Sequence, residues 1–279
     1  MNNFSSQGSV VGSRNSGIRH QKRNKLFLNM PTSVFRLLTT SFLTPDYRLL
    51  TTLLVACLFS IAWPMAVQAA VLSGKVVFEG EVPAPKPINF GAEKQCATMH
   101  GDKMPVAEDL VINTDKTVKW ALVYVKTGAQ ASPAPAEAVE IDQKGCIFAP
   151  HAAVARAGQK VIFKNSDAIL HNVRSESKVN KAFNIAQPVQ GMTTAKTFAQ
   201  PEIGIKIRCD VHFWMASFIH VFDHPFYAVT GDDGSYEIKD LPAGTYTIEV
   251  WHEKLGAQTA EVTVTESETK TADFTLKIS

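Results

Sequence analysis

The sequence has few cysteines and lacks the motifs of several enzyme classes. It contains 4 cysteines in 279 residues. It has no G-x-S-x-G run, no C-x-x-C-H run and no glycine loop of the kind that cradles phosphate. These absences disfavour serine hydrolases, covalently attached haem and phosphate-binding folds. No H-x-H or H-C-H pair is present, so the ligands of multi-metal oxidase clusters are missing. We therefore expect a protein that is not an enzyme.

The first 69 residues are typical of an export signal with a long basic leader. Residues 1–28 are polar and basic, and residues 49–67 are almost wholly apolar. The run ends in Val67-Gln68-Ala69, a pattern typical of a cleavage site. This order predicts export to the periplasm, with the signal cleaved near Ala69.

Three alternatives to this leader remain open. One is a retained membrane anchor, which Pro64 and the small residues at the end of the run disfavour. Another is a lipoprotein site at Cys57. Translation could also begin at Met30, which would leave a leader of more ordinary length. We expect cleavage, and hence no membrane span in the mature chain.

The mature chain is expected to be acidic. The whole sequence has 28 Lys and Arg and 26 Asp and Glu, of which 7 and 1 lie in residues 1–69. Cleavage therefore leaves 21 basic and 25 acidic residues, a formal charge of −4. Because a nucleic-acid partner would require a basic face, we expect none.

The rest of the chain predicts an all-β protein. Short runs of β-branched and aromatic residues are separated by turn residues, and no amphipathic helix follows the leader. A proline- and alanine-rich stretch at 127–138 and a turn at 223–225 interrupt these runs. They divide the mature chain into three segments, 70–130, 131–223 and 224–279.

One short run holds three side chains that are potential metal ligands. Cys209, His212 and Met215 are spaced three residues apart, and His171 follows a predicted strand 38 residues before Cys209. Two imidazoles, a thiolate and a thioether are the ligands of an electron-transfer copper site, because soft sulfur ligands select copper. The alternative left open is a site that has lost its metal or binds zinc, although zinc has little use for a thioether.

Residues 136–223 resemble a cupredoxin, and most closely an amicyanin. The resemblance rests on the run "AGQKVIFKNSDAILHNV" and on the short C-x2-H-x2-M loop. It implies one type 1 copper, whose three in-plane ligands and one axial ligand would be His171, Cys209, His212 and Met215. It also implies that Asn172 donates a backbone hydrogen bond to the thiolate and ties the two ligand loops together.

The same resemblance implies a periplasmic one-electron carrier. Redox partner proteins would dock near His212, which is expected to reach the surface beside Phe213 and Trp214. The alternative for these two aromatic rings is packing beneath the loop. A second function also remains open, in which the chain binds or delivers copper without redox chemistry, or serves as an interaction module through its outer β-sandwich.

Residues 224–279 resemble the carboxypeptidase regulatory-like (transthyretin-like) β-sandwich. The run "GDDGSYEIKDLPAGTY" carries this resemblance, which concerns the fold and not an activity. The pattern lacks its opening strands, and the upstream runs "LSGKVVFEG" and "VKWALVYV" look like them. We expect the cupredoxin to be inserted into an outer sandwich split between 70–130 and 224–279, with tandem domains as the alternative.

Three cysteines remain once Cys57 leaves with the leader. If Cys96 and Cys146 pair in an oxidising compartment, the remaining thiol is Cys209, the suspected metal ligand. Such a disulfide would tie the outer sandwich to the copper domain. The alternative is three buried free thiols.

Overall fold

The structure, a computed structural model, describes residues 69–278. In these residues the strands form four sheets, and the one α-helix is α2 (Lys94–Thr98). The prediction of an all-β fold is therefore confirmed. The export signal predicted for 1–69 lies outside the described residues, apart from Ala69. Among the described residues, no helix has the length and apolar character needed to cross a membrane.

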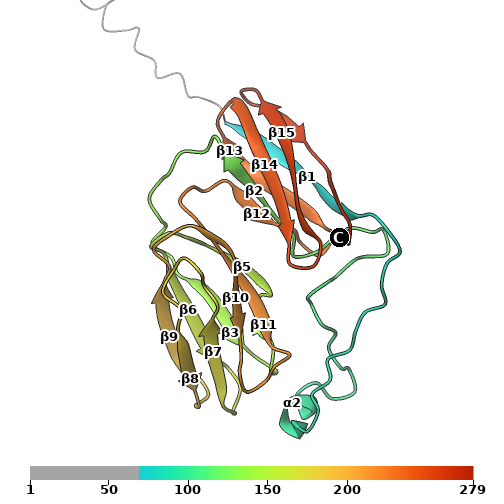
Figure 1. The fold of residues 1–279 in the computed structure, drawn as a ribbon, viewed down its shortest axis with the longest axis vertical. Coiled ribbons are helices and arrows are strands. Elements are labelled where there is room, and N and C mark those ends of the chain that lie inside the picture. Colours follow the sequence, from blue (N-terminus) through green and yellow to red (C-terminus); the bar gives the residue numbers. More distant parts are fainter. Residues whose placement is uncertain (1–68, 279) are drawn as a thin grey trace, which may run out of the picture. The chain divides into compact units, whose positions relative to one another are not determined.

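Two of the sheets share one hydrophobic core and form the outer sandwich (Figure 1). The first sheet has the order β13 (Ser235–Leu241), β1 (Ala70–Phe78), β16 (Thr269–Thr271), and β1 also pairs with β17 (Phe274–Leu276). The second sheet has the order β12 (Tyr227–Val229), β2 (Leu122–Thr127), β14 (Gly244–His252), β15 (Gly256–Val264). Strands from both ends of the described chain therefore build one sandwich.

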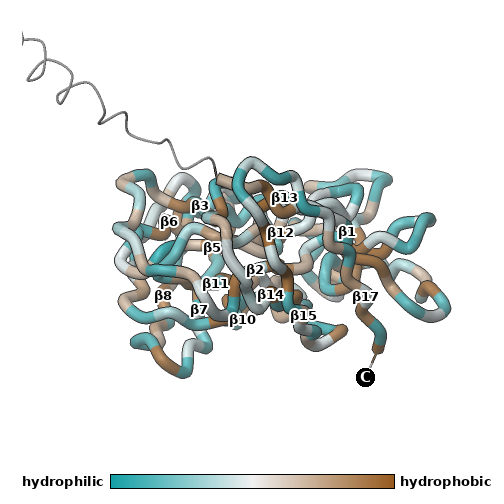
Figure 2. The backbone as a smooth tube through the Cα atoms, turned by 90° about the horizontal axis from the view of Figure 1, so that it is seen from above, coloured by the Kyte–Doolittle hydropathy of each residue, from teal (hydrophilic) through white to brown (hydrophobic). Residues whose placement is uncertain are grey.

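Strand β1 shows how the sequence produces this sandwich. Its side chains alternate between the core and the opposite face, so that Leu72, Val76 and Phe78 are buried. Figure 2 shows hydrophobic residues gathered where β1 and β17 lie together. Gly74 interrupts the apolar pattern because a Cβ there would lie 2.0 Å from the Ala272 carbonyl oxygen. Only glycine permits this close approach.

The other two sheets form the central sandwich. One has the order β4 (Phe148–Ala149), β3 (Val139–Gln143), β6 (Lys160–Asn165), β9 (Thr193–Thr197). The other has the order β5 (Ala152–Arg156), β11 (Ala216–Phe222), β10 (Glu202–Arg208), β7 (His171–Ser175), β8 (Asn184–Gln187). Side chains of both sheets, among them Phe163 and Ile219, meet in a second core.

The chain enters and leaves the central sandwich at adjacent points. The Ser132 N–H donates to the Asp223 carbonyl at 2.9 Å, and the buried Arg156 guanidinium donates to the carbonyls of both residues at 2.6 Å. A third apolar cluster, which includes Leu122 of β2 and Phe222 of β11, joins the two sandwiches. The central sandwich is thus an insertion between β2 and β12.

Candidate metal centre

The four predicted ligands come from one edge of three neighbouring strands. His171 is the first residue of β7, Cys209 directly follows β10, and Met215 directly precedes β11. Strand β10 pairs antiparallel with both β7 and β11. Antiparallel pairing places the end of β10 beside the start of each neighbour, so these positions meet at the same edge of the sheet.

The loop between β10 and β11 is closed by its own hydrogen bonds. The Cys209 N–H donates to the Met215 carbonyl at 3.3 Å, and the Met215 N–H donates to the His212 carbonyl at 2.9 Å. The His212 N–H points to the Cys209 sulfur at 3.4 Å. The three-residue spacing therefore folds the loop back on itself, and Met215 packs in the same buried cluster as Cys209.

Donor atoms of His171, Cys209 and His212 converge beneath the surface. The two Nδ1 atoms are 2.9 Å apart, and the Cys209 Sγ is 3.8 Å from the His212 Nδ1. One donor atom from each residue lies within 4.8 Å of the other two, and the three residues are at most 2% exposed. Donors that share one ion at about 2.0–2.3 Å lie about 3.5–4 Å apart. The spacing is therefore close to that of a single three-donor site.

Asn172 connects the two segments that carry the donors. Its N–H donates to the Cys209 Sγ at 3.4 Å, and its side-chain carbonyl accepts the Asp210 N–H at 2.5 Å. Its amide nitrogen donates to the Asn184 side chain at 2.5 Å. Asn172 thus fixes the sulfur relative to His171 and donates one of the backbone N–H groups that point to it.

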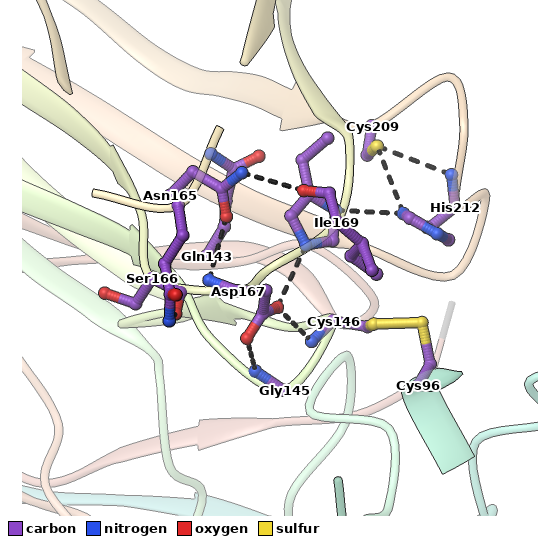
Figure 3. A network of polar contacts seen from close by, with 12 residues as sticks. Cys96, Gln143, Gly145, Cys146, Asn165, Ser166, Asp167, Ile169, Cys209 and His212 are labelled. Atoms are coloured by element: carbon purple, nitrogen blue, oxygen red, sulfur yellow. Dashed lines mark hydrogen bonds and ion pairs between the residues drawn. A yellow bond between two sulfur atoms is a disulfide. The ribbon is translucent and has the colours of Figure 1, made fainter. Parts of the chain in front are cut away.

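Asp167 is a site residue that the sequence patterns do not single out. Its Oδ2 lies 2.9 Å from the His171 Nε2, and its carboxylate accepts the N–H groups of Gly145 and Cys146 at 2.7 and 2.8 Å (Figure 3). Its own N–H donates to the Asn165 side chain at 2.9 Å. A carboxylate on the far nitrogen of a ligand histidine fixes the orientation of the ring. The feature of the sequence that could have pointed to Asp167 is its position four residues before His171.

The protonation states of the site follow from burial and from these hydrogen bonds. Burial alone would raise the pKa of the Cys209 thiol, but hydrogen bonds from His171 and from backbone N–H groups lower it below its ordinary value. Burial would lower the pKa of His171, but Asp167 and Cys209 raise it. Burial and the neighbouring His171 both lower the pKa of His212. The site therefore favours a thiolate and a neutral His212, which are metal-binding forms.

Cys96 and Cys146 form a disulfide with an S–S distance of 2.04 Å, and Cys209 is the free cysteine of the described residues. The predicted pairing is therefore confirmed. Both bonded cysteines are fully buried. The disulfide links α2 to the turn before β4, directly beside the candidate centre (Figure 3).

The structure corrects the expectation that His212 reaches the surface, because this side chain is 2% exposed. The Trp214 ring lies 5.2 Å from the His212 ring, and Phe90 packs edge-on against Trp214 at 5.2 Å. The Trp214 Nε1 donates to the Cys146 carbonyl at 3.0 Å. Phe213, in contrast, is 83% exposed. Cys96, in the long segment between β1 and β2 that sequence patterns do not place, also lies close to the His212 ring.

The donor set fits copper better than zinc. A thiolate and two imidazoles suit either ion. Met215 is buried in the same loop, and its thioether is a soft group suited to copper. The residues present therefore fit the metal that the sequence predicts.

Replacing Asp167 with asparagine is expected to reduce stability and to change the titration of His171. The variant loses the charge that faces His171 and one acceptor for the N–H groups of Gly145 and Cys146. We expect the free energy of unfolding at pH 7 to fall by about 1–3 kcal/mol and the pKa of His171 to fall, measured by urea unfolding and by NMR titration of the metal-free protein.

The shifted pKa of Asp167 fixes the pH range in which this residue stabilises the protein. Hydrogen bonds hold the pKa of Asp167 below its ordinary value although burial opposes them. Its contribution is therefore present above about pH 4 and is lost as the pH falls through the folded-state value. Asp210→Asn, a change at a more exposed carboxylate nearby, is the matched control. Equal losses in the two variants would contradict the role assigned to Asp167.

The C-terminal part of the chain matches a known family. Residues 219–277 match the model of the carboxypeptidase regulatory-like domain, which confirms the resemblance predicted for this part. The match begins within β11 and extends through β12 to β17. No curated protein matches the chain.

Several solved structures are similar to part of the chain. A copper-containing nitrite reductase from Thermus scotoductus SA-01 is 22% identical over 36% of this chain and 25% of its own, with a TM-score of 0.29. A purple cupredoxin from Nitrosopumilus maritimus is 20% identical over 30% of this chain and 98% of its own, with a TM-score of 0.26. An oxidised amicyanin variant is 18% identical over 36% of this chain and 97% of its own, with a TM-score of 0.28. This chain therefore spans about a quarter of the nitrite reductase chain.

Proposed function

We propose that this chain is exported to the periplasm, binds one copper ion in a type 1 site and carries single electrons. The observation that best supports the proposal is the buried convergence of two imidazole nitrogens and one thiolate sulfur. Such a set, with a weak thioether ligand, is typical of electron-transfer copper sites. The proposed ligands are His171, Cys209, His212 and Met215.

The residues around the donors would keep them in place during electron transfer. Bound copper would supply a change of one electron between its two oxidation states. Asp167 orients the His171 ring, and the N–H groups of Asn172 and His212 point to the thiolate sulfur. Donors held by such contacts rearrange little when the charge of the site changes, and this keeps the barrier to electron transfer low.

Copper delivery is the less favoured function. A delivery protein must pass its ion to an acceptor, and this requires a ligand that the acceptor can reach. His171, Cys209 and His212 are each at most 2% exposed. The family match of the outer sandwich concerns a fold, so it favours no particular activity.

Copper titration of the metal-free mature protein tests the proposal. We expect one Cu(II) ion per chain and an intense visible absorption band from charge transfer between the thiolate and copper. One electron equivalent should remove the band, and reoxidation should restore it. Weak or absent binding, or a bound copper without the intense band, would contradict the proposed site.

A negative charge at Phe213 is expected to slow electron exchange with a protein partner. The ring is 83% exposed and lies 5.2 Å from Trp214, which in turn contacts His212. Phe213→Glu should therefore reduce the rate of reduction by the physiological partner protein by about tenfold. The rate with an uncharged small reductant such as hydroquinone, and the copper absorption band, should change little.

Val179→Glu is the matched control for this change. Val179 is 60% exposed and lies beyond the C-terminal end of β7, whereas His171 begins this strand. This variant should react with the partner protein at the parent rate. Equal slowing in both variants would show that the effect is one of net charge and not of a docking surface at Phe213.

A further inference from the structure

The segment between β1 and β2, residues 79–121, is named the cap. Within it the structure has the short helix α2 and an isolated bridge between Pro87 and Val106. Most side chains from 79 to 95 are exposed, whereas Cys96 is fully buried. The cap is therefore a long excursion from the outer sandwich that is joined covalently to the central sandwich at one residue.

The cap covers the His212 side chain. The sulfurs of Cys96 and Cys146 and a ring nitrogen of His212 all lie within 4.8 Å of one another. On either side of His212 in the loop, Val211 is 43% exposed and Phe213 is 83% exposed. His212 itself is 2% exposed. The His212 ring therefore lies between the other donors of the site and the disulfide that holds the cap.

Besides the disulfide, noncovalent contacts hold this part of the cap: Phe90 is buried in the core of the central sandwich, and the partly buried Ile88 and Ala97 pack against that core. The Phe90 ring meets Trp214 edge-on, and the His100 Nε2 lies 2.7 Å from the Gly145 carbonyl oxygen. Phe90 and His100 stack on each other within the cap at 5.4 Å. All of these contacts are noncovalent, so they can break and re-form as the cap moves, whereas the disulfide cannot.

A cavity adjoins these contacts and limits the packing of the cap. Its volume is about 320 Å³, and its lining includes Ile88 and Val106 of the cap and Trp214 and Met215 of the ligand loop. The cap and the ligand loop are therefore not in continuous contact beside these residues. Segments with few buried contacts open locally at low free energy unless a covalent bond prevents it.

We propose that the Cys96–Cys146 disulfide locks the cap over His212 and thereby controls the access of water, chelators and copper to the metal centre. The inference rests on the proposed function, because it treats His212 as a metal ligand. With the bond formed, Cys96 cannot move away from the His212 ring. Without it, only noncovalent contacts hold the cap, which then opens more often, and the ring becomes accessible.

Chemical modification of histidines in the metal-free protein tests the lock without copper. Diethyl pyrocarbonate reacts with neutral imidazoles that reach solvent, and mass spectrometry of peptides measures the rate at each histidine. His212 should react slowly in the disulfide-bonded parent. In the Cys96→Ala/Cys146→Ala double variant it should react about tenfold faster or more, because the cap opens locally.

His220 serves as the internal control for unfolding. It is fully buried on β11 against the Trp251 ring at 5.0 Å. The measured quantity is the ratio of the His212 rate to the His220 rate. A higher ratio in the double variant supports the lock. An unchanged ratio, whether both rates rise or neither does, overturns it.

A variant that keeps the disulfide separates the covalent bond from the other contacts. His100→Ala removes the hydrogen bond to the Gly145 carbonyl and leaves the bond between Cys96 and Cys146 in place. The ratio of the His212 and His220 rates should remain at the parent value. A rise as large as in the double variant would show that these contacts, and not the disulfide, hold the cap.

Loss of copper to a chelator tests the consequence for the metal. The double variant should lose its ion about tenfold faster or more than the parent, because its cap opens more often. Equal rates of loss, together with a raised histidine ratio, would show that the cap covers His212 without controlling the metal. If the parent binds no copper, the proposed function fails, and the histidine ratio still decides whether the lock exists.

Discussion

Cys209→Ser is expected to abolish the intense visible absorption of the copper-loaded protein. The band requires a thiolate bound to copper, and a serine hydroxyl is a hard, neutral group that does not replace it. The structure favours a thiolate at this position, because hydrogen bonding with His171 and backbone N–H groups lowers the pKa of Cys209. The band should fall by at least about tenfold in intensity, as measured by titrating each protein with Cu(II).

Two properties of the variant separate loss of the ligand from loss of the fold. Serine is close to cysteine in size, so the far-ultraviolet circular dichroism of the β-sandwiches should be unchanged. The Cys96→Ala/Cys146→Ala variant, which retains Cys209, should keep its band. An intense band that survives in Cys209→Ser would exclude Cys209 as the ligand and with it the type 1 assignment.

Removal of the disulfide is expected to have the largest effect on stability. The bond joins residues separated by 50 positions, and both cysteines are buried. A crosslink that closes a loop of this length restricts the unfolded chain and stabilises the fold by about 4 kcal/mol. Urea unfolding of the metal-free Cys96→Ala/Cys146→Ala variant should show a loss of this size.

Thiol counting and a second cysteine variant serve as controls. The denatured, non-reduced mature protein should have one titratable thiol, that of Cys209, whereas three would show that the disulfide does not form. Cys209→Ser should cost the metal-free protein less than about 2 kcal/mol, because it removes no crosslink. A loss below about 1 kcal/mol in the double variant would contradict the stabilisation expected from the crosslink.

Strands with apolar runs were predictable from the sequence, and polar edge strands were not. The run "SYEIKDL" coincides with β13, because its alternating side chains are buried on one face. Strands β8 and β9 lie at the edges of their sheets and consist mainly of polar or small residues. They form by pairing with β7 and β6, and this pairing depends on segments distant in sequence.

In the run "VKWALVYV" the sequence pattern predicts a longer strand than the structure has. Its composition predicts a strand from 118 to 125, but β2 begins at Leu122. Trp120 has a φ of 65°, which ends the extended conformation, and its Nε1 donates to Glu108 in the cap at 3.2 Å. A contact to another segment thus decides the backbone conformation, and the local composition does not contain it.

The sequence by itself determined the β class, the chemical types and order of the donor side chains, and the family of the C-terminal part, because these depend on local pattern and composition. Only the tertiary structure decided that Asp167 faces His171, that the donors of His171, Cys209 and His212 converge, and that a disulfide-linked cap buries His212. These features depend on contacts between segments such as Cys96 and the loop at 209–215, more than 100 residues apart. Such contacts arise when the two sandwiches pack and the chain between β1 and β2 is drawn back over the central one, and no local pattern specifies them.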